Sequence, residues 1–145
     1  MQFSMVGADA QGRSTVVSVK SVEFPHDPQG LAVETLWAMA AEEIKAAPPH
    51  AKDSHWMDLG LADGALRWVM WRLPPGSTSQ MHHTDTVDCQ VILAGEVTCE
   101  LGAGEVRLRP GDAILIPGLE HKWVASSEGC TLAGVCRGLP ARPPA

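Results

Sequence analysis

The chain has 145 residues, a formal net charge of -6 and a hydrophobic fraction of 45%. That length is enough for one domain, spanning residues 1–145, with a sizeable core and no need of cross-links. Acidic and basic residues are mixed without a basic stripe, so nucleic acid is not an expected partner. No apolar run approaches the roughly 20 residues of a membrane span, and the first residues lack a secretory signal, so we expect a cytoplasmic protein.

Four cysteines lie in the second half of the sequence, at Cys89, Cys99, Cys130 and Cys136. None forms a C-x-x-C pair, which argues against a redox dithiol or a thiolate zinc site. Because the chain is long and shows no export signal, free and buried thiols are the expected state.

The first part of the chain mixes a predicted strand with irregular sequence. Residues 1–13 contain a turn signal and are expected to form a loosely held arm. Residues 14–24 alternate apolar and polar side chains and are rich in valine, which predicts a strand. Residues 38–47 are rich in alanine and glutamate, which favours a short helix, so we expect a helical or loop insertion over residues 38–60.

From residue 65 onward, short apolar runs alternate with glycine and proline turns. The predicted strands lie near 65–73, 80–84, 88–93, 96–101, 105–109, 113–117, 121–125 and 130–137. Turns are expected between them, including Ala94-Gly95 and Ser126–Gly129. Many short, evenly spaced strands predict an all-β sandwich or barrel, here over residues 14–137. The proline-rich residues 138–145 are expected to form a flexible tail.

Residues 76–95 contain the densest set of metal-capable side chains in the sequence. Successive side chains of a strand point to opposite faces. If His82 points into the barrel, then Asp88 and Gln90 do so as well, past a bend, whereas His83 points the other way.

A two-residue turn at 94–95 would pair Gln90 with Cys99 and place Cys99 inside the barrel. The apolar side chains of this hairpin then face inward and its charged side chains face solvent, which supports the register. On a later predicted strand, His121 and Trp123 share one face.

The barrel interior is therefore expected to hold His82, Asp88 and His121 together. Two imidazoles and one carboxylate form a facial triad that leaves positions open for water or substrate. Such a set suits Fe(II), Mn, Ni or Zn and does not select among them. His83 and Gln90 are weaker candidates for metal ligands.

The residues expected to line a pocket around this site combine a hydroxyl, an amide, a thiol and two indoles. They are Thr84, Gln90, Cys99, Trp71 and Trp123. The indoles would provide an apolar wall, so the expected partner is a small apolar or aromatic molecule. The same interior also fits a metal-free polar network, in which His82 hydrogen-bonds to Asp88 and His121 is a satisfied core histidine.

The spacing of these residues resembles the two motifs of small single-domain cupins. The matching positions are Gly76-x5-His82-x-Thr84-x3-Asp88-x6-Gly95, then Gly111-Asp112 and Gly118-x2-His121-x-Trp123. Cupin motifs have a second histidine at the position of Thr84, a glutamate at Asp88 and an asparagine at Ala125. The spacing of the first motif thus follows the family. In the second motif the proline-to-glycine spacing, at Pro117-Gly118, is one residue short, and three residue types depart from the family pattern.

The resemblance implies the cupin double-stranded β-helix, which is a jelly-roll barrel, in agreement with the strand pattern. It places a fourth ligand position at Thr84, whose hydroxyl is a poor ligand, so the site should be weaker or more open than a full cupin site. It also implies a homodimer formed through exchanged N-terminal strands, for which residues 14–24 are available.

Three functions remain open at this point. The first is a small-molecule metabolic enzyme that uses a divalent metal as a Lewis acid, for isomerisation, decarboxylation, dehydration or cyclisation; with iron, the triad could instead serve a dioxygenase. The second is a metal-free barrel that binds a small ligand without catalysis. The third is a structural or oligomer-forming domain whose site has decayed, and fold alone cannot choose among them.

Overall fold

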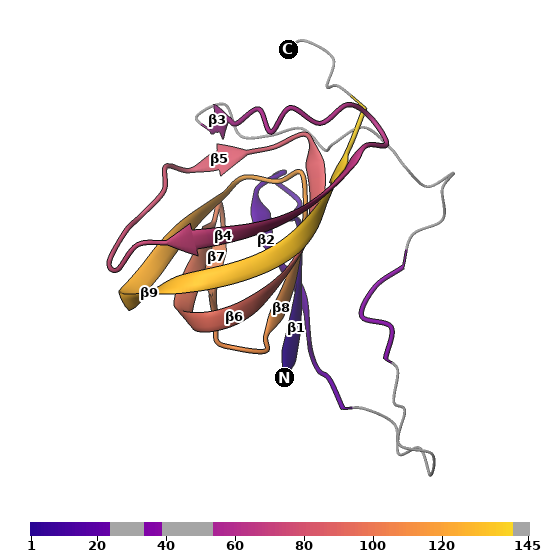
Figure 1. The fold of residues 1–145 in the computed structure, drawn as a ribbon. Coiled ribbons are helices and arrows are strands. Elements are labelled where there is room, and N and C mark those ends of the chain that lie inside the picture. Colours follow the sequence, from indigo (N-terminus) through magenta and orange to yellow (C-terminus); the bar gives the residue numbers. More distant parts are fainter. Residues whose placement is uncertain (24–33, 39–53, 141–145) are drawn as a thin grey trace.

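The computed structural model describes residues 1–23, 34–38 and 54–140, and every regular element within these ranges is a β-strand. The strands are β1 (Gln2–Ala8), β2 (Ser14–Ser21), β3 (His55–Trp56), β4 (Leu66–Leu73), β5 (His82–His83), β6 (Thr86–Leu101), β7 (Gly104–Leu108), β8 (Ala113–Pro117) and β9 (His121–Gly138). They form one 9-stranded sheet that curls around a buried core (Figure 1). The predicted all-β barrel is therefore confirmed.

Part of the predicted insertion can be compared with the structure. The helix expected over residues 38–47 falls outside the described residues except at Ala38, which is not in a regular element. Residues 54–60 contribute the two-residue strand β3, which pairs with β5. Within the described ranges, no helix is long and apolar enough to cross a membrane.

The two longest strands, β6 and β9, are each continuous where the sequence predicted a turn. β6 has 16 residues, β9 has 18, and the two pair antiparallel from one end to the other. The predicted turns at Ala94-Gly95 and Ser126–Gly129 are therefore wrong, and so is the predicted pairing of Gln90 with Cys99. The ladder between β6 and β9 instead contains two register shifts, between Ile92 and Ala94 and between Gly95 and Val97.

Two glycines explain why the chain bends at these positions without reversing. Gly95 has φ 71° and Gly129 has φ 80°, a region that other residues rarely adopt. Gly95 pairs with Cys130, and a Cβ added at Gly95 would overlap the carbonyl oxygen of Gly129. The glycines thus permit a close approach of two bulged strands, which curves the sheet.

Both ends of the described chain are more ordered than the sequence predicted. β1 lies between β2 and β8, antiparallel to the first and parallel to the second. Its side chains Phe3 and Val6 are buried, so residues 1–13 are not a loose arm. At the other end, Leu139 is buried and its backbone N–H donates a hydrogen bond to the carbonyl of Asp85, so the expected flexible tail is packed at this residue.

The faces predicted for the second half of β6 are correct. Val97, Cys99 and Leu101 are buried in the main apolar core, which fills the space between β6, β7, β8 and β9. Cys99 is part of this core and does not line the pocket expected around the site. All four cysteines are free, and three are buried, whereas Cys89 is exposed, contrary to expectation.

We expect Gly95→Ala to lower the free energy of unfolding by about 2–4 kcal/mol, because it combines a positive φ with a backbone clash. The matched control is Gly76→Ala: Gly76 has φ 65°, but a Cβ there meets no atom within 4 Å. Urea denaturation monitored by tryptophan fluorescence measures both. Equal destabilisation by the two substitutions would contradict the close approach of β6 and β9.

Candidate functional site

Two histidines face each other across neighbouring strands at one end of the barrel. His82 of β5 pairs in antiparallel register with His121, the first residue of β9. Both side chains are buried, and their ring centroids lie 4.3 Å apart. Residues directly opposite each other in an antiparallel pair project from the same face, so the strand register brings these two imidazoles together.

Each of the two imidazoles has its tautomer set by a backbone carbonyl. The distance from His82 Nδ1 to the carbonyl oxygen of Gln80 is 2.9 Å, and that from His121 Nδ1 to the carbonyl oxygen of Leu119 is also 2.9 Å. A carbonyl oxygen only accepts hydrogen bonds, so Nδ1 of each neutral ring carries the proton. The lone pair of each ring is therefore on Nε2, the arrangement typical of metal-ligating histidines.

Burial keeps both imidazoles uncharged. Burial, together with the neighbouring His82, lowers the pKa of His121 to about 3. Burial also lowers the pKa of His82, although the carbonyl of Gln80 and the carboxyl of Asp88 partly oppose this effect. Both rings are therefore neutral at pH 7, the form in which histidine binds a metal or accepts a proton.

Asp88 is buried on β6 and is held by its neighbours. The Thr86 hydroxyl lies 2.7 Å from Asp88 Oδ1 and 2.8 Å from Thr84 Oγ1, so Thr86 links the other two side chains in a buried chain. Cys136, opposite Asp88 on β9, also donates a hydrogen bond to its carboxyl. Burial raises the pKa of Asp88, while the donors Thr86 and Cys136 act in the opposite direction.

A cavity of about 160 Å³ brings these groups together. Its lining includes all three predicted ligands, His82, Asp88 and His121, and four of the five predicted pocket residues. Those four are Thr84, Gln90, Trp71 and Trp123. Trp123 also makes an edge-on contact with the ring of His121, with centroids 5.5 Å apart. The cavity therefore combines polar groups on one side with an apolar aromatic wall.

Gln90 has an unusual place in this cavity. The residue is buried, and its Oε1 atom has no hydrogen-bond partner among the described residues. Leaving a buried acceptor unpaired typically costs about 1–3 kcal/mol. A bound cation or a ligand with a hydrogen-bond donor would relieve that cost.

His83, the other weaker ligand candidate, does not line the cavity. It is buried on the opposite side of β5, where its Nδ1 atom is hydrogen-bonded to the hydroxyl of Ser54. Among the described residues, no group of three or more His, Cys, Asp or Glu side chains is arranged to hold a metal ion. The structure thus brings His82 and His121 into contact as a pair, while Asp88 shares their cavity and is bonded to Thr86 and Cys136.

Several contributors to the site were not found from the sequence. Met57 and Leu59 line the cavity from the irregular segment after β3, which has no periodic signal. His55 lies beside His82 in the parallel pair of β3 with β5, and its proximity lowers the pKa of His82. Cys136 was recognised as a thiol, but only the pairing of β6 with β9 shows that it contacts Asp88.

Comparison with known proteins finds a resemblance to a cupin domain in part of the chain. A family model described as "Cupin domain" matches residues 69–135, from within β4 to within β9. The chain is 42% identical over 50 residues to the phomopsin biosynthesis cluster protein C' of Diaporthe leptostromiformis, and 40% identical over 55 residues to the cupin-domain-containing oxidoreductase srdB of Neurospora crassa. These matches cover 34% and 37% of this chain, but only 26% and 28% of the two relatives.

Solved structures with a similar fold include KdgF from Halomonas sp., at 24% identity and a TM-score of 0.46, with 56% of this chain and 76% of that chain covered. A Cupin 2 conserved barrel domain protein from Salinispora arenicola has 13% identity and a TM-score of 0.46, with 81% and 90% covered. Both TM-scores lie below 0.5, so the resemblance to a cupin domain rests on the sequence match. The match to the cupin domain model thus covers residues 69–135, which is less than half of the chain.

Proposed function

We propose that this protein binds a divalent metal ion through His82 and His121 and is a small-molecule metabolic enzyme. The observation that carries the proposal is the pair of Nε2 lone pairs on two buried, neutral imidazoles that line one cavity. Imidazole nitrogen is a preferred ligand of Fe, Ni and Zn, and carboxylates or water complete sites for these ions and for Mn. The other nitrogen of each ring, Nδ1, is hydrogen-bonded to a backbone carbonyl that orients the ring, as is usual for metal-binding histidines.

The remaining donors in the cavity fit such an ion. Asp88 is the proposed third ligand. A carboxylate has about four lone-pair sites, so the hydrogen bonds from Thr86 and Cys136 orient the carboxyl and still leave lone pairs for a metal ion. Gln90 is a further ligand candidate because its buried amide oxygen lacks a partner. Thr84 lines the cavity with a hydroxyl, a poor ligand, which would leave a position for water or substrate.

The proposed reaction is an isomerisation, decarboxylation, dehydration or cyclisation. A bound divalent ion would supply Lewis acidity toward a carbonyl or carboxylate of the substrate. Trp71 and Trp123 would exclude water and contact apolar or aromatic parts of the substrate. Asp88, whose pKa is raised by burial, could hold or release a proton at its carboxyl oxygen.

Cavity size restricts the proposed substrate. The volume of about 160 Å³ lies below the roughly 300–1,000 Å³ of sites that enclose drug-sized molecules. Only a small molecule, or the reacting end of a larger one, would fit beside the two histidines. The free state of all four cysteines agrees with a reducing compartment, and the cytoplasm is the proposed location.

An Fe(II)-dependent dioxygenase is a second candidate function. The Neurospora crassa relative is named an oxidoreductase, and the aligned segment covers 37% of this chain. Substrate-dependent oxygen uptake by the iron-loaded protein would favour this function over Lewis-acid chemistry. A ligand that raises the melting temperature of metal-free protein, yet is recovered unchanged, would instead favour a binding barrel.

Substituting either histidine of the pair should remove metal binding. We expect His82→Ala and His121→Ala each to weaken Zn²⁺ or Mn²⁺ binding at least about 100-fold, since each loses a direct ligand and losing an outer-shell partner already costs 10–100-fold. Isothermal titration of untagged protein measures this. Glu105→Ala is the control, because Glu105 is an exposed carboxylate on β7 that does not line the cavity and should leave binding unchanged. Sub-stoichiometric metal that is unaffected by both substitutions would refute the metal proposal.

A paired substitution tests the third ligand. Asp88→Asn retains the shape of the side chain but removes its charge, and we expect about tenfold weaker metal binding, equivalent to about 1.4 kcal/mol. Gln90→Leu should weaken binding less, because a neutral amide oxygen contributes less charge. The reverse order, with Gln90→Leu the more damaging, would assign the third position to Gln90.

Acid should destabilise the metal-free protein through His121. Its pKa falls from 6.5 to about 3 on burial, so between these values the unfolded chain binds more protons than the folded chain. The free energy of unfolding therefore decreases as pH falls from 6.5 toward 3, by about 1–2 kcal/mol between pH 7 and pH 5 for this group. The raised pKa of Asp88 opposes the trend.

Urea denaturation of chelator-treated protein at several pH values measures this dependence. His121→Asn should flatten it, because it removes the group whose pKa burial lowers. A steep dependence that persists in His121→Asn would show that other groups cause the acid sensitivity.

A further inference from the structure

Glu120 is a buried acidic residue that the proposed function does not use. It lies in the loop that joins β8 to β9, between Leu119 and His121, and it is 1% exposed. It does not line the cavity of the histidine pair. Acidic side chains are rarely buried unless they are paired, because they lose their hydration. Glu120 immediately precedes one of the two proposed metal ligands, so its partners bear on the site.

One carboxyl oxygen of Glu120 holds the start of β2. The backbone N–H of Ser14 donates a hydrogen bond of 2.8 Å to Glu120 Oε1. Ser14 is itself buried and accepts two hydrogen bonds from the turn between β6 and β7. Its Oγ atom accepts one of 2.6 Å from the N–H of Gly102, and its carbonyl accepts one of 2.7 Å from the N–H of Ala103. We refer to Glu120, Ser14 and Gly102, which join three segments distant in sequence, as the loop clamp.

Gly102 leaves the space that the carboxyl group of Glu120 occupies. A Cβ added at Gly102 would lie 2.6 Å from Glu120 Oε1 and 3.3 Å from the backbone nitrogen of Ser14. The φ angle of Gly102 is not positive, so its backbone conformation is open to other residues. The close approach of Glu120, and not the shape of the turn, therefore requires glycine at this position.

The loop clamp acts on His121 through the backbone. The carbonyl of Leu119, which accepts the hydrogen bond of 2.9 Å from His121 Nδ1, belongs to the peptide bond between Leu119 and Glu120. A peptide group is planar, so the direction of this carbonyl is fixed when the backbone on either side of it is fixed. The side chain of Leu119 is held in the main apolar core, and that of Glu120 is held by Ser14. Both ends of the peptide group are thereby anchored.

Strand pairing alone does not orient the ring of His121. This residue pairs with Leu101 of β6 and with His82 of β5. That pairing determines where the Cα atom lies and from which face the side chain projects. The hydrogen bond to Leu119 determines which ring nitrogen carries the proton. An orienting acceptor in a fixed position is therefore a separate requirement of the site.

We propose that Glu120 is a positioning residue of the histidine site. Through the loop clamp it fixes the carbonyl of Leu119, which keeps the proton of His121 on Nδ1 and the lone pair on Nε2. This role rests on the proposed metal-binding function, because that lone pair is one of the two proposed imidazole ligands. Glu120 touches neither the metal nor the substrate, since it does not line the cavity.

The ring nitrogens of His121 can be observed without any metal. Long-range ¹H–¹⁵N NMR of chelator-treated protein, labelled with ¹⁵N-histidine, reports which nitrogen is protonated, and His121→Asn assigns the signals. We expect the Nδ1–H tautomer in the wild type and a mixture of both tautomers in Glu120→Leu, which removes the acceptor for Ser14. Glu120 Oε2 has no hydrogen-bond partner among the described residues. Glu120→Gln therefore retains the acceptor for Ser14 and should retain the wild-type tautomer.

Isothermal titration with Zn²⁺ measures the consequence for the proposed site. We expect binding to weaken about 10–100-fold in Glu120→Leu, as for other outer-shell partners of metal ligands, and by less than about threefold in Glu120→Gln. Gly102→Ala, which displaces the carboxyl group from outside the loop, should resemble Glu120→Leu. Phe3→Leu is the control for lost stability, because Phe3 is buried in the second apolar cluster, away from the cavity. Circular dichroism checks that each variant is folded.

The tautomer of His121 separates positioning from general stability. An unchanged tautomer in both Glu120→Leu and Gly102→Ala would overturn the proposal. So would an equal shift in Phe3→Leu, since the effect would then follow from lost stability. If the tautomer shifts as expected but the wild type binds no Zn²⁺, the metal-binding function fails and the positioning of His121 by Glu120 stands.

Discussion

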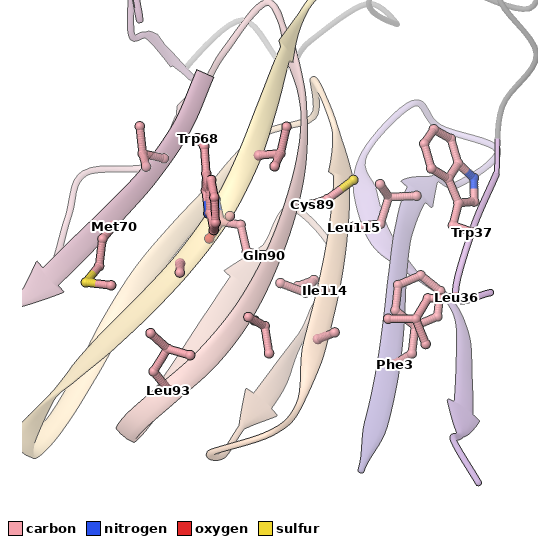
Figure 2. A pocket seen from close by; sticks show the side chains of 16 residues that line it. Phe3, Leu36, Trp37, Trp68, Met70, Cys89, Gln90, Leu93, Ile114 and Leu115 are labelled. Atoms are coloured by element: carbon pink, nitrogen blue, oxygen red, sulfur yellow. The ribbon is translucent and has the colours of Figure 1, made fainter. Parts of the chain in front are cut away.

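The antiparallel ladder between β6 and β9 supports both faces of the sheet. It runs from the pair Thr86 and Gly138 to the pair Leu101 and His121. Along the inner surface it places Cys136 opposite Asp88 and aligns His121 with β5, where His82 meets it. On the outer surface the same ladder forms part of the floor of an apolar trough of about 780 Å³ (Figure 2), so loss of this pairing would remove the cavity and the trough together.

Burial determines the chemical character of the inner cavity. It holds two imidazoles in the neutral state and raises the pKa of the nearby Asp88 carboxyl. The backbone carbonyls of Gln80 and Leu119 then orient the rings without adding charge. Two uncharged ring nitrogens and one carboxyl are suited to bind a cation. The nitrogens offer lone pairs, and no described residue that lines the cavity other than Asp88 would balance the positive charge.

The inner cavity and the outer trough are separated by a single layer of sheet. Gln90 lines both of them, with its neighbour Cys89 exposed on the outer side. Opposite Gln90 stands Gly134, which shares the inward face of Gln90 and adds no side chain to it. The two surfaces nevertheless differ in character, because the inner one concentrates polar groups, whereas none of the described residues that line the outer trough is charged.

The sequence by itself determined the properties that depend on local alternation. It predicted the all-β class, the inward direction of His82, Asp88, Gln90 and His121, and the aromatic wall at Trp123, because side-chain direction in a strand follows from position. Only the tertiary structure decided where strands continue. Gly95 and Gly129 are compatible with turns or bulges, and the choice depends on which distant backbone packs against them. The same long-range pairing gave Asp88 its Cys136 partner, placed β1 inside the sheet and assigned Cys99 to the core, none of which is encoded in local spacing.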